Sequence, residues 1–298
     1  MNDSADNSMT EPMVSDHPLY ALVKTSAGVL SILHRATGEI MHNPIGPWVE
    51  ANALYVEQSR LLERWSRETS EFVVYDVGLG AGANALATLH CIRNARSVAG
   101  KRFRLVSFEK EMDLLHYALS HADQFPHFSG FQEAIRTLTT DGKWEDESIT
   151  WELYEGDFLE CVLETDTKPH FIYFDPYSPK MNPEMWSTES FKKLHGKIRT
   201  REEGGTSLYT YSQSTPVRVA LLRAGFYVGV GHSTGLKRET TVASSHLHML
   251  ENPLGERWLK RWKTSQTPYP LLASEAEKPE IDEFITGHRQ FLVSSQEP

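Results

Sequence analysis

The feature that most constrains the fold is an apolar run that ends on an aspartate and breaks into three alternating glycines. The run is Phe72-Val-Val-Tyr-Asp76, and the glycines are Gly78, Gly80 and Gly82. Glycine tolerates φ > 0 and lets a backbone approach a ligand closely, with the N–H groups of the next helix nearby. The stretch therefore predicts a strand, a tight turn and a helix start built around a nucleotide-like ligand.

The spacing of the glycines separates two ligand classes. In the dinucleotide fingerprint the third glycine comes three residues after the second, which suits a pyrophosphate at the helix N-terminus. Here position 83 is alanine, and only Ala81 separates Gly80 from Gly82. An acidic residue, Asp76, just before this shorter run favours a cationic ligand without phosphate. We therefore expect S-adenosylmethionine, while another nucleotide or a purely structural tight turn stays open.

Composition limits the function classes. A net charge of −10 argues against indiscriminate nucleic-acid binding, since phosphate neutralisation needs a basic surface, although a local basic face is compatible with it. Two cysteines, Cys91 and Cys161, are too few for a disulfide framework and favour a reducing, cytoplasmic setting. No apolar segment approaches membrane-spanning length, and the polar start lacks the features of a signal peptide. We expect a cytoplasmic enzyme without membrane contact, and the sequence leaves its oligomeric state open.

The apolar residues alternate between strand and helix periods, which predicts an α/β fold with a mostly parallel sheet. Two strand-like segments near the end of the pattern, 226–230 and 240–248, have only a loop between them and predict an antiparallel hairpin at one edge. The other expected strands cover 72–75, 103–108, 150–154, 170–174 and 207–211, and the helices cover 83–96, 188–198 and 216–224.

The flanking segments predict smaller parts around this sheet. A hairpin of 19–23 and 29–33 and a helix over 50–65 precede it, and Trp258 and Trp262 are spaced to share a helix face in a loosely attached tail beyond Asn252. The expected division is a disordered tail at 1–17, an appendage at 18–70, the main domain at 71–250 and a C-terminal tail at 251–298.

Ligands of an open parallel sheet lie outside the carboxyl ends of its strands, so the residues that end each strand are candidates. Glu109 ends the second strand, where a carboxylate accepts from both ribose hydroxyls of an adenosine; a plain surface acid is the alternative. Asp157 follows a later strand and is placed to accept from the adenine amine, but capping the next helix explains it equally well.

The segment after the fourth strand is the most distinctive one. Asp175-Pro-Tyr-Ser-Pro…Asn182-Pro-Glu-Met-Trp186 resembles the Asp-Gly-Phe-Ala-Pro…Asn-Pro-x-Met-Trp segment in the methyltransferase half of the MnmC family. These bacterial enzymes complete 5-methylaminomethyl-2-thiouridine at the tRNA wobble position. Other stretches agree in order over roughly Gly38 to Ala243: Gly46-Pro…Glu50-Ala, Asp76 to Asn84, Phe108-Glu-Lys110, Gly156-Asp157, Gly204-Gly-Thr206, Ala224-Gly-Phe226 and Lys237-Arg-Glu239.

The resemblance implies a class I S-adenosylmethionine-dependent methyltransferase that acts on the 5-aminomethyl nitrogen of a wobble uridine, without the flavin-dependent oxidase half. Asp175 takes the place of the family's catalytic-loop aspartate. Pro176, Tyr177 and Ser178 replace the family's Gly, Phe and Ala, which puts the acceptor in question. The cofactor-binding residues that the resemblance implies are Asp76, Gly78, Gly80, Gly82, Asn84, Glu109 and Asp157.

Several residues are candidates for contact with the anticodon region of tRNA. Tyr177 and Trp186 are expected to stack on a flipped-out base, with a core anchor as the alternative for Trp186. Lys180, Arg238 and the basic cluster 192–201 are candidates for phosphate contacts, with a solvated helix face as the alternative for the cluster.

Two other functions stay open. Asp175-Pro-Tyr loosely echoes the Asp-Pro-Pro-Tyr of enzymes that methylate exocyclic base amines, so the acceptor can be another amine. A cofactor-binding scaffold without turnover is the non-enzymatic alternative, which the intact Asp175 and glycine turn disfavour. His246-x-His248 lacks a nearby set of carboxylates or thiolates, so no metal site is expected.

Overall fold

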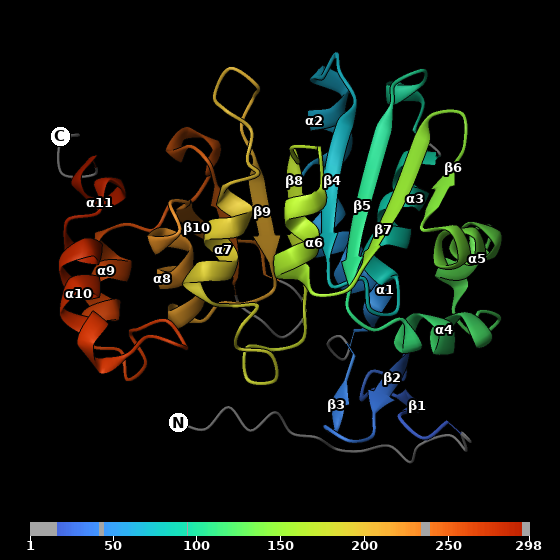
Figure 1. Cartoon of the computed structure of the whole chain (residues 1–298), viewed down its shortest axis with the longest axis horizontal. Coiled ribbons are helices and arrows are strands. Elements are labelled where there is room, and N and C mark those ends of the chain that lie inside the picture. The colour runs from blue at the N-terminus through green and yellow to red at the C-terminus, as the bar shows by residue number, and fades with distance from the viewer. Residues whose placement is uncertain (1–16, 42–44, 94, 234–238, 294–298) are drawn as a thin grey trace.

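The fold is built on a central sheet of eight strands in the order β10-β11-β9-β8-β4-β5-β7-β6 (Figure 1). The computed structural model describes residues 17–41, 45–93, 95–233 and 239–293. The parallel strands are β4 (Phe72–Val77), β5 (Phe103–Glu109), β7 (Ile149–Glu155), β8 (Phe171–Phe174) and β9 (Ser207–Thr210). The antiparallel strands are β10 (Tyr227–Gly231) and β11 (Thr240–Ser244) at one edge and β6 (Lys143–Glu145) at the other. The predicted mostly parallel sheet with an edge hairpin is confirmed; β6 was not predicted.

Helices cover both faces of this sheet, as the unbroken apolar strands require. Along β4, Phe72 and Val74 point into one buried cluster, while Val73 and Tyr75 point into the other. The first face carries α2 (Leu61–Arg67), α3 (Ala83–Arg93), α4 (Asp113–Ser120), α5 (Gln132–Asp141) and the short 3₁₀ turns Arg96–Val98 and Pro126–Phe128. The second carries α6 (Phe158–Glu164), α7 (Thr188–His195) and α8 (Thr215–Arg223).

A separate three-stranded sheet lies beyond one end of the central strands, at the bottom of Figure 1. Its strands β1 (Tyr20–Lys24), β2 (Leu30–His34) and β3 (Glu39–Ile40) are antiparallel, which confirms the predicted hairpin and adds a third strand.

The expected single helix over 50–65 is interrupted. It consists of α1 (Pro47–Ala51), a π-helical turn (Asn52–Glu57) and α2. Arg60, which directly precedes α2, has a left-handed φ of 51°. A residue in that conformation ends one helix before the next begins. Leu54, Leu61 and Trp65 still enter one buried cluster, so the apolar pattern predicted the buried residues but not the break.

The C-terminal segment is packed rather than loosely attached, which corrects the expectation for its described residues. It forms α9 (Glu256–Lys263), a 3₁₀ turn (Glu275–Glu277), α10 (Lys278–Thr286) and α11 (Arg289–Val293). Trp258 and Trp262 do share a helix face, and both are buried in the cluster that covers β8. The Gln290 side chain donates to the carbonyl of Val228 on β10 and accepts from its N–H, at 2.7 and 2.8 Å. The segment therefore covers the edge of the sheet.

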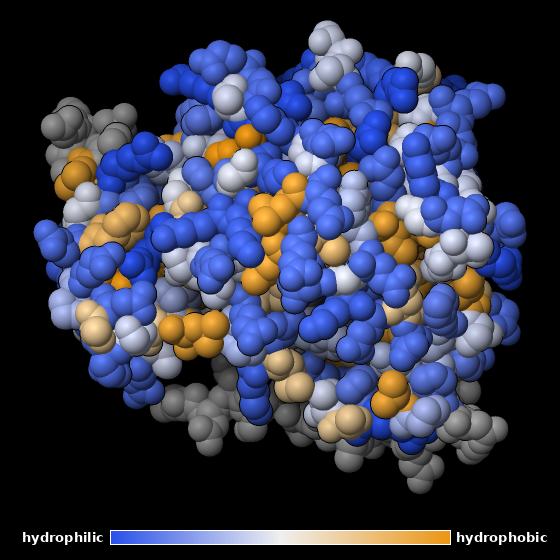
Figure 2. Space-filling model, viewed as in Figure 1, coloured by the Kyte–Doolittle hydropathy of each residue, from blue (hydrophilic) through white to orange (hydrophobic). Residues whose placement is uncertain are grey.

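The face of the molecule seen in Figure 2 is mostly hydrophilic, with apolar residues in small patches separated by polar ones. This agrees with the acidic, polar composition. In the described part of the chain, no helix is long and apolar enough to cross a membrane.

Candidate functional site

Three predicted carboxylates meet because their strands are neighbours. β4 pairs with β5 on one side and with β8 on the other, so the carboxyl ends of all three strands lie together. Asp76 lies near the end of β4, Glu109 ends β5, and Asp175 directly follows β8. The N–H of Asp175 donates to the carbonyl of Val77 at 2.9 Å, which continues the pairing of the two strands into the loop.

Asp76 ends a row of buried polar groups that crosses three strands. The Trp151 indole donates to the Ser107 hydroxyl at 2.9 Å, and this hydroxyl donates to Oδ2 of Asp76 at 2.9 Å. The other oxygen of the Asp76 carboxylate, Oδ1, is buried and accepts no hydrogen bond from the described residues. Burial raises the pKa of Asp76 to about 8, with a smaller contribution from the charges of Asp175 and Glu109.

The glycine turn follows Asp76 and packs on the loop that carries Asp175. Gly78, Gly80 and Gly82 have φ values of 89°, 53° and 81°, so all three use the region that disfavours other residues. A Cβ on Gly78 would lie 2.7 Å from the carbonyl oxygen of Asp175. The first glycine is therefore required for the close approach of two backbones, and not for the turn alone.

Glu109 is tied to the same turn. Its Oε2 accepts from the N–H of Gly80 at 2.8 Å, and its Oε1 accepts from the N–H groups of Lys110 and Glu111 at 2.8 and 3.2 Å. Burial raises the pKa of Glu109, and these backbone hydrogen bonds oppose the shift. The carboxylate is thus held in one orientation at the end of β5.

Asp175 is held by a residue that we expected to bind the cofactor. The side-chain amide of Asn84, at the start of α3, donates to Oδ2 of Asp175 at 2.6 Å. Two phenols face the same carboxylate: burial, and then the charge of Asp175, raises the pKa of Tyr55 and of Tyr211 well above the ordinary value. Sequence reasoning missed both tyrosines. Tyr211 comes just after β9 and was within reach of the strand-end argument, whereas Tyr55 lies in a helical turn and gave no signal.

The loop after Asp175 contacts the three-stranded sheet. The Ser178 hydroxyl donates to Oε1 of Glu39 on β3 at 2.8 Å. The Tyr177 ring lies edge-on to His34 of β2, with centroids 6.3 Å apart, and 39% of the residue is exposed. Tyr177 is thus partly exposed to solvent, and the small sheet lies beside it.

Trp186 is a core residue, which is the alternative to base stacking. It is fully buried, its indole donates to the carbonyl of Tyr177 at 2.8 Å, and its ring packs edge-on against Phe174. A ring without exposed surface offers no face to a base, so the expected stacking is corrected to a core anchor beneath the loop.

The remaining predicted residues differ in what the structure says of them. Asp157 caps α6, because its Oδ1 accepts from the N–H of Leu159 at 2.8 Å, and its contact with adenine stays a prediction. Lys180 is exposed on the loop that follows Asp175. Arg238 lies outside the described residues.

The basic cluster 192–201 spans the second half of α7 and the start of the segment that leads to β9. Lys197 donates to the carbonyls of Leu163 and Thr165 at the end of α6, at 3.1 and 2.9 Å. Arg199 donates from its backbone to Thr206, which directly precedes β9. Lys197 and Arg199 thus lie at the amino ends of the parallel strands, and this placement does not support their expected phosphate contact near Asp175. Lys193 instead donates to the carbonyl of Leu159 at the start of α6, at 3.3 Å, and its phosphate contact stays a prediction.

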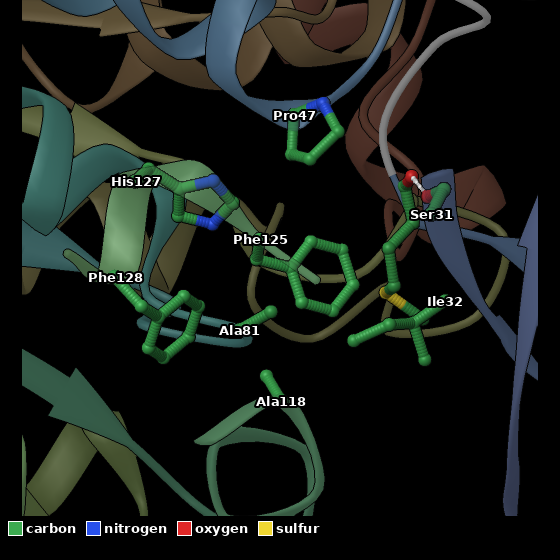
Figure 3. Close-up of a pocket in the computed structure, with 9 residues that line it drawn as sticks. Ser31, Ile32, Pro47, Ala81, Ala118, Phe125, His127 and Phe128 are labelled. Atoms are coloured by element: carbon green, nitrogen blue, oxygen red, sulfur yellow. Dashed lines mark hydrogen bonds between the residues drawn. The ribbon is translucent and has the colours of Figure 1, made fainter. Parts of the chain in front are cut away.

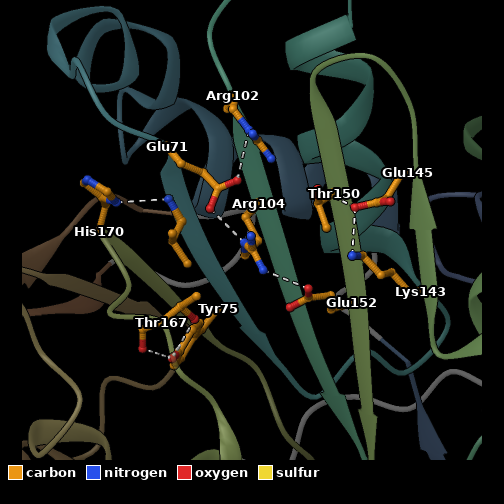
Figure 4. A network of polar contacts seen from close by, with 11 residues as sticks. Glu71, Tyr75, Arg102, Arg104, Lys143, Glu145, Thr150, Glu152, Thr167 and His170 are labelled. Carbon is orange, nitrogen blue, oxygen red and sulfur yellow. Dashed lines mark hydrogen bonds and ion pairs between the residues drawn. The ribbon is translucent and has the colours of Figure 1, made fainter.

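Other cations at the amino ends are used within the chain (Figure 4). Arg104 on β5 lies between Glu71 and Glu152 and bonds each at 2.8 Å, while Arg102 lies 3.6 Å from Glu71. Such pairs link β4, β5 and β7 away from the glycine turn.

An apolar pocket lies beside the turn at Ala81 (Figure 3). The three-stranded sheet, the start of α1, α4 and the 3₁₀ turn Pro126–Phe128 surround it. The residues that line it are Ser31, Ile32, Met41, Pro47, Ala81, Ala118, Phe125, His127 and Phe128.

These residues fit a cationic adenosyl ligand. The buried Oδ1 of Asp76 is an acceptor without a donor, which suits an ammonium, and the glycine turn leaves the backbone open in front of it. Glu109 ends the neighbouring strand, where ribose hydroxyls find an acceptor. For a metal ion, the described residues contain no group of three or more potential ligands.

Comparison with known proteins finds relatives over most of the chain. A family model described as S-adenosyl-L-methionine-dependent methyltransferase matches residues 129–246. An uncharacterized protein of Methanocaldococcus jannaschii is 25% identical over 240 residues, which are 80% of this chain and 63% of that protein. The tRNA 5-methylaminomethyl-2-thiouridine biosynthesis bifunctional protein MnmC of Paraburkholderia xenovorans is 26% identical over 277 residues, 90% of this chain and 39% of MnmC. The crystal structure of MNMC2 from Aquifex aeolicus superposes with a TM-score of 0.68 at 22% identity, covering 92% of this chain and 86% of that one.

The chain has the fold of class I S-adenosylmethionine-dependent methyltransferases, and a family model of such enzymes matches part of it, which confirms the predicted fold class and cofactor. Within that class the chain is related to MnmC, as the segment from Asp175 to Trp186 indicated. It spans about a third to two fifths of the length of these MnmC relatives.

Proposed function

We propose that this chain transfers the methyl group of S-adenosylmethionine to the 5-aminomethyl nitrogen of the wobble uridine in tRNA. The observation that carries the proposal is the position of Asp175, whose loop packs on the glycine turn and continues into the exposed ring of Tyr177. The relatives named for tRNA 5-methylaminomethyl-2-thiouridine biosynthesis support this choice of acceptor.

Methyl transfer to an amine is helped by a correctly placed carboxylate. S-adenosylmethionine supplies an electrophilic methyl group on a positively charged sulfonium. An amine attacks only through its lone pair, so the acceptor must be neutral, and it becomes a substituted ammonium on methylation. Asp175 would accept a hydrogen bond from the amine, orient the lone pair, stabilise the forming ammonium and take its proton directly or through water. Positioning of the two reactants supplies much of the remaining rate.

The parts of the chain take roles that follow from this proposal. Residues 71–250 are the methyltransferase domain, and 18–70 supply the wall that contacts Tyr177 and Ser178. Tyr177 stacks on the acceptor base, Lys180 meets a phosphate of the anticodon region, and Asp157 contacts the adenine. A tRNA substrate places the enzyme in the cytoplasm.

Mass spectrometry of wobble nucleosides from cells with and without this chain tests the acceptor. We expect 5-aminomethyl-2-thiouridine to accumulate and its methylated form to disappear when the chain is removed. Methylation of another amine by the purified protein, with unchanged wobble nucleosides, would replace the proposal by an acceptor of a different kind. Binding of S-adenosylmethionine without turnover on any amine would favour the scaffold.

The variant Asp175→Asn tests the role of the carboxylate. It should bind S-adenosylmethionine like the parent and lose about 10²-fold or more in single-turnover rate on tRNA bearing 5-aminomethyl-2-thiouridine. The control Asp141→Asn makes the same chemical change at an exposed position at the end of α5 and should keep the parent rate. A parent-like rate for Asp175→Asn at neutral pH would show that another group orients the amine.

A further inference from the structure

We infer that Asn84 is a positioning residue for Asp175, and that its side-chain amide sets the orientation of the carboxylate that receives the acceptor amine. The inference deepens the proposed function and rests on it. It changes the role of a residue that the sequence placed among the ligands of the cofactor alone.

The geometry leaves the Asp175 carboxylate little freedom. The amide nitrogen Nδ2 of Asn84 lies 2.6 Å from Oδ2 of Asp175, and Asn84 is 3% exposed, so bulk water does not replace the amide readily. The main chain of Asp175 is fixed as well, by its bond to Val77 and by the contact of its carbonyl with Gly78. A charge-assisted hydrogen bond from a buried donor is among the stronger ones and is costly to remove.

The surroundings explain why this donor matters. Asp76 of β4 is close enough for the charge of Asp175 to raise its pKa, and Glu50 of α1 raises the pKa of the same two phenols, Tyr55 and Tyr211. Neighbouring carboxylates disfavour a further ionised carboxyl, and a donor to the ionised form favours it. The Asn84 amide therefore helps to keep Asp175 ionised as well as oriented.

Asn84 also connects the two halves of the site. It lies in the first turn of α3, directly after the glycine turn, while Asp175 follows β8. One side chain thus joins the turn that faces the cofactor to the group that faces the acceptor. The Asn84 oxygen Oδ1 is buried and accepts no hydrogen bond from the described residues, so it stays available to a donor on the cofactor.

The test measures single-turnover rates across pH at saturating S-adenosylmethionine, so that a change in cofactor affinity does not enter. Asn84→Ala should lower the rate about 10- to 100-fold, as expected for the loss of a hydrogen bond to a charged group. Its acidic limb should move to higher pH, since the carboxylate protonates more readily without the donor. Asn84→Leu, which keeps most of the volume and lacks the donor, serves as a second variant if the alanine variant does not fold.

A double-mutant cycle separates positioning from a general structural effect. Added to Asp175→Asn, the change Asn84→Ala should alter the rate by less than about twofold, because its effect passes through the missing carboxylate. The control Thr88→Val lies one turn further along α3 and is equally buried. The Thr88 hydroxyl donates to the main-chain carbonyl of Asn84 and contacts Tyr173, so the variant changes the packing around Asn84 while keeping the side-chain amide that holds Asp175. It should leave the pH profile of the parent unchanged.

Two results would overturn the inference. One is a weaker affinity for S-adenosylmethionine in Asn84→Ala with the saturated rate and acidic limb of the parent. The other is full multiplication of the two effects in the double variant.

A measurement without acceptor keeps the two proposals apart. The ¹³C carboxyl resonance of Asp175, identified by its loss in Asp175→Asn, should titrate at higher pH in Asn84→Ala than in the parent or Thr88→Val. An unchanged titration rejects the role of Asn84. Failure of the parent protein to methylate the tRNA rejects the proposed function and leaves this result standing.

Discussion

Replacing Gly78 with alanine should force the glycine turn away from the loop that carries Asp175. The added methyl group would lie 2.7 Å from the carbonyl oxygen of Asp175 and 2.9 Å from Cα of Pro176. Both are backbone atoms, so no side chain can rotate out of the way. The φ of 89° at Gly78 adds a second cost, because L-residues avoid the left-handed region.

The two costs can be added. The left-handed backbone costs roughly 1–2 kcal/mol, and overpacking costs roughly 1–3 kcal/mol. The free energy of unfolding should therefore fall by about 2–5 kcal/mol. Relief of the clash requires the two backbones to move apart by about 1 Å or less. In a reaction that depends on alignment, a misplacement of that size can lower the rate about 10²-fold. Methyl transfer should fall even where the variant folds.

Gly100→Ala is the matched control. Gly100 has a φ of 78°, close to that of Gly78, but nothing lies within 4 Å of the position of an added Cβ. Both variants carry the backbone strain, and only Gly78→Ala carries the clash. Urea unfolding should show an extra loss of about 1 kcal/mol or more for Gly78→Ala, and calorimetry should show weaker binding of S-adenosylmethionine for this variant alone. Equal stabilities and equal affinities for the two variants would refute the reasoning.

Three further predictions concern Asp76, Trp186 and Tyr177. Burial raises the pKa of Asp76 from 3.8 to about 8, so its contribution to the free energy of unfolding is present below the lower value and lost as the pH rises through the higher one. Urea unfolding of Asp76→Asn across this range should lack that decline, and a decline equal to the parent's would contradict the assignment. A cationic cofactor next to Asp76 favours the carboxylate, so binding at neutral pH should release protons, seen in calorimetry as heats that depend on the buffer and vanish in Asp76→Asn. Trp186→Ala should cost about 3–5 kcal/mol of unfolding free energy, whereas Tyr177→Ala should cost far less and weaken acceptor binding; the reverse order would return Trp186 to the substrate side.

The local part of the site could be predicted from the sequence. A strand that ends at an acid and runs into glycines sets its own backbone, because only glycine takes the positive φ that the turn needs. The alternation of strand and helix periods predicted the parallel sheet. A parallel sheet brings the carboxyl ends of its strands together, and with them Asp76, Glu109 and Asp175.

Tertiary structure alone decided what these residues touch. Asn84 and Asp175 are 91 positions apart, and the pairing of β4 with β8 brings them to hydrogen-bond distance. Trp186 reads alike as a stacking ring or a core anchor until the packing around Phe174 removes its exposed surface. The burial of Trp258 and Trp262 in one cluster with Phe174 likewise depends on partners far along the chain. The periodicity of the sequence indicates which face of an element is apolar. The partner of that face depends on the whole fold, because residues that pack or form hydrogen bonds can be far apart in sequence.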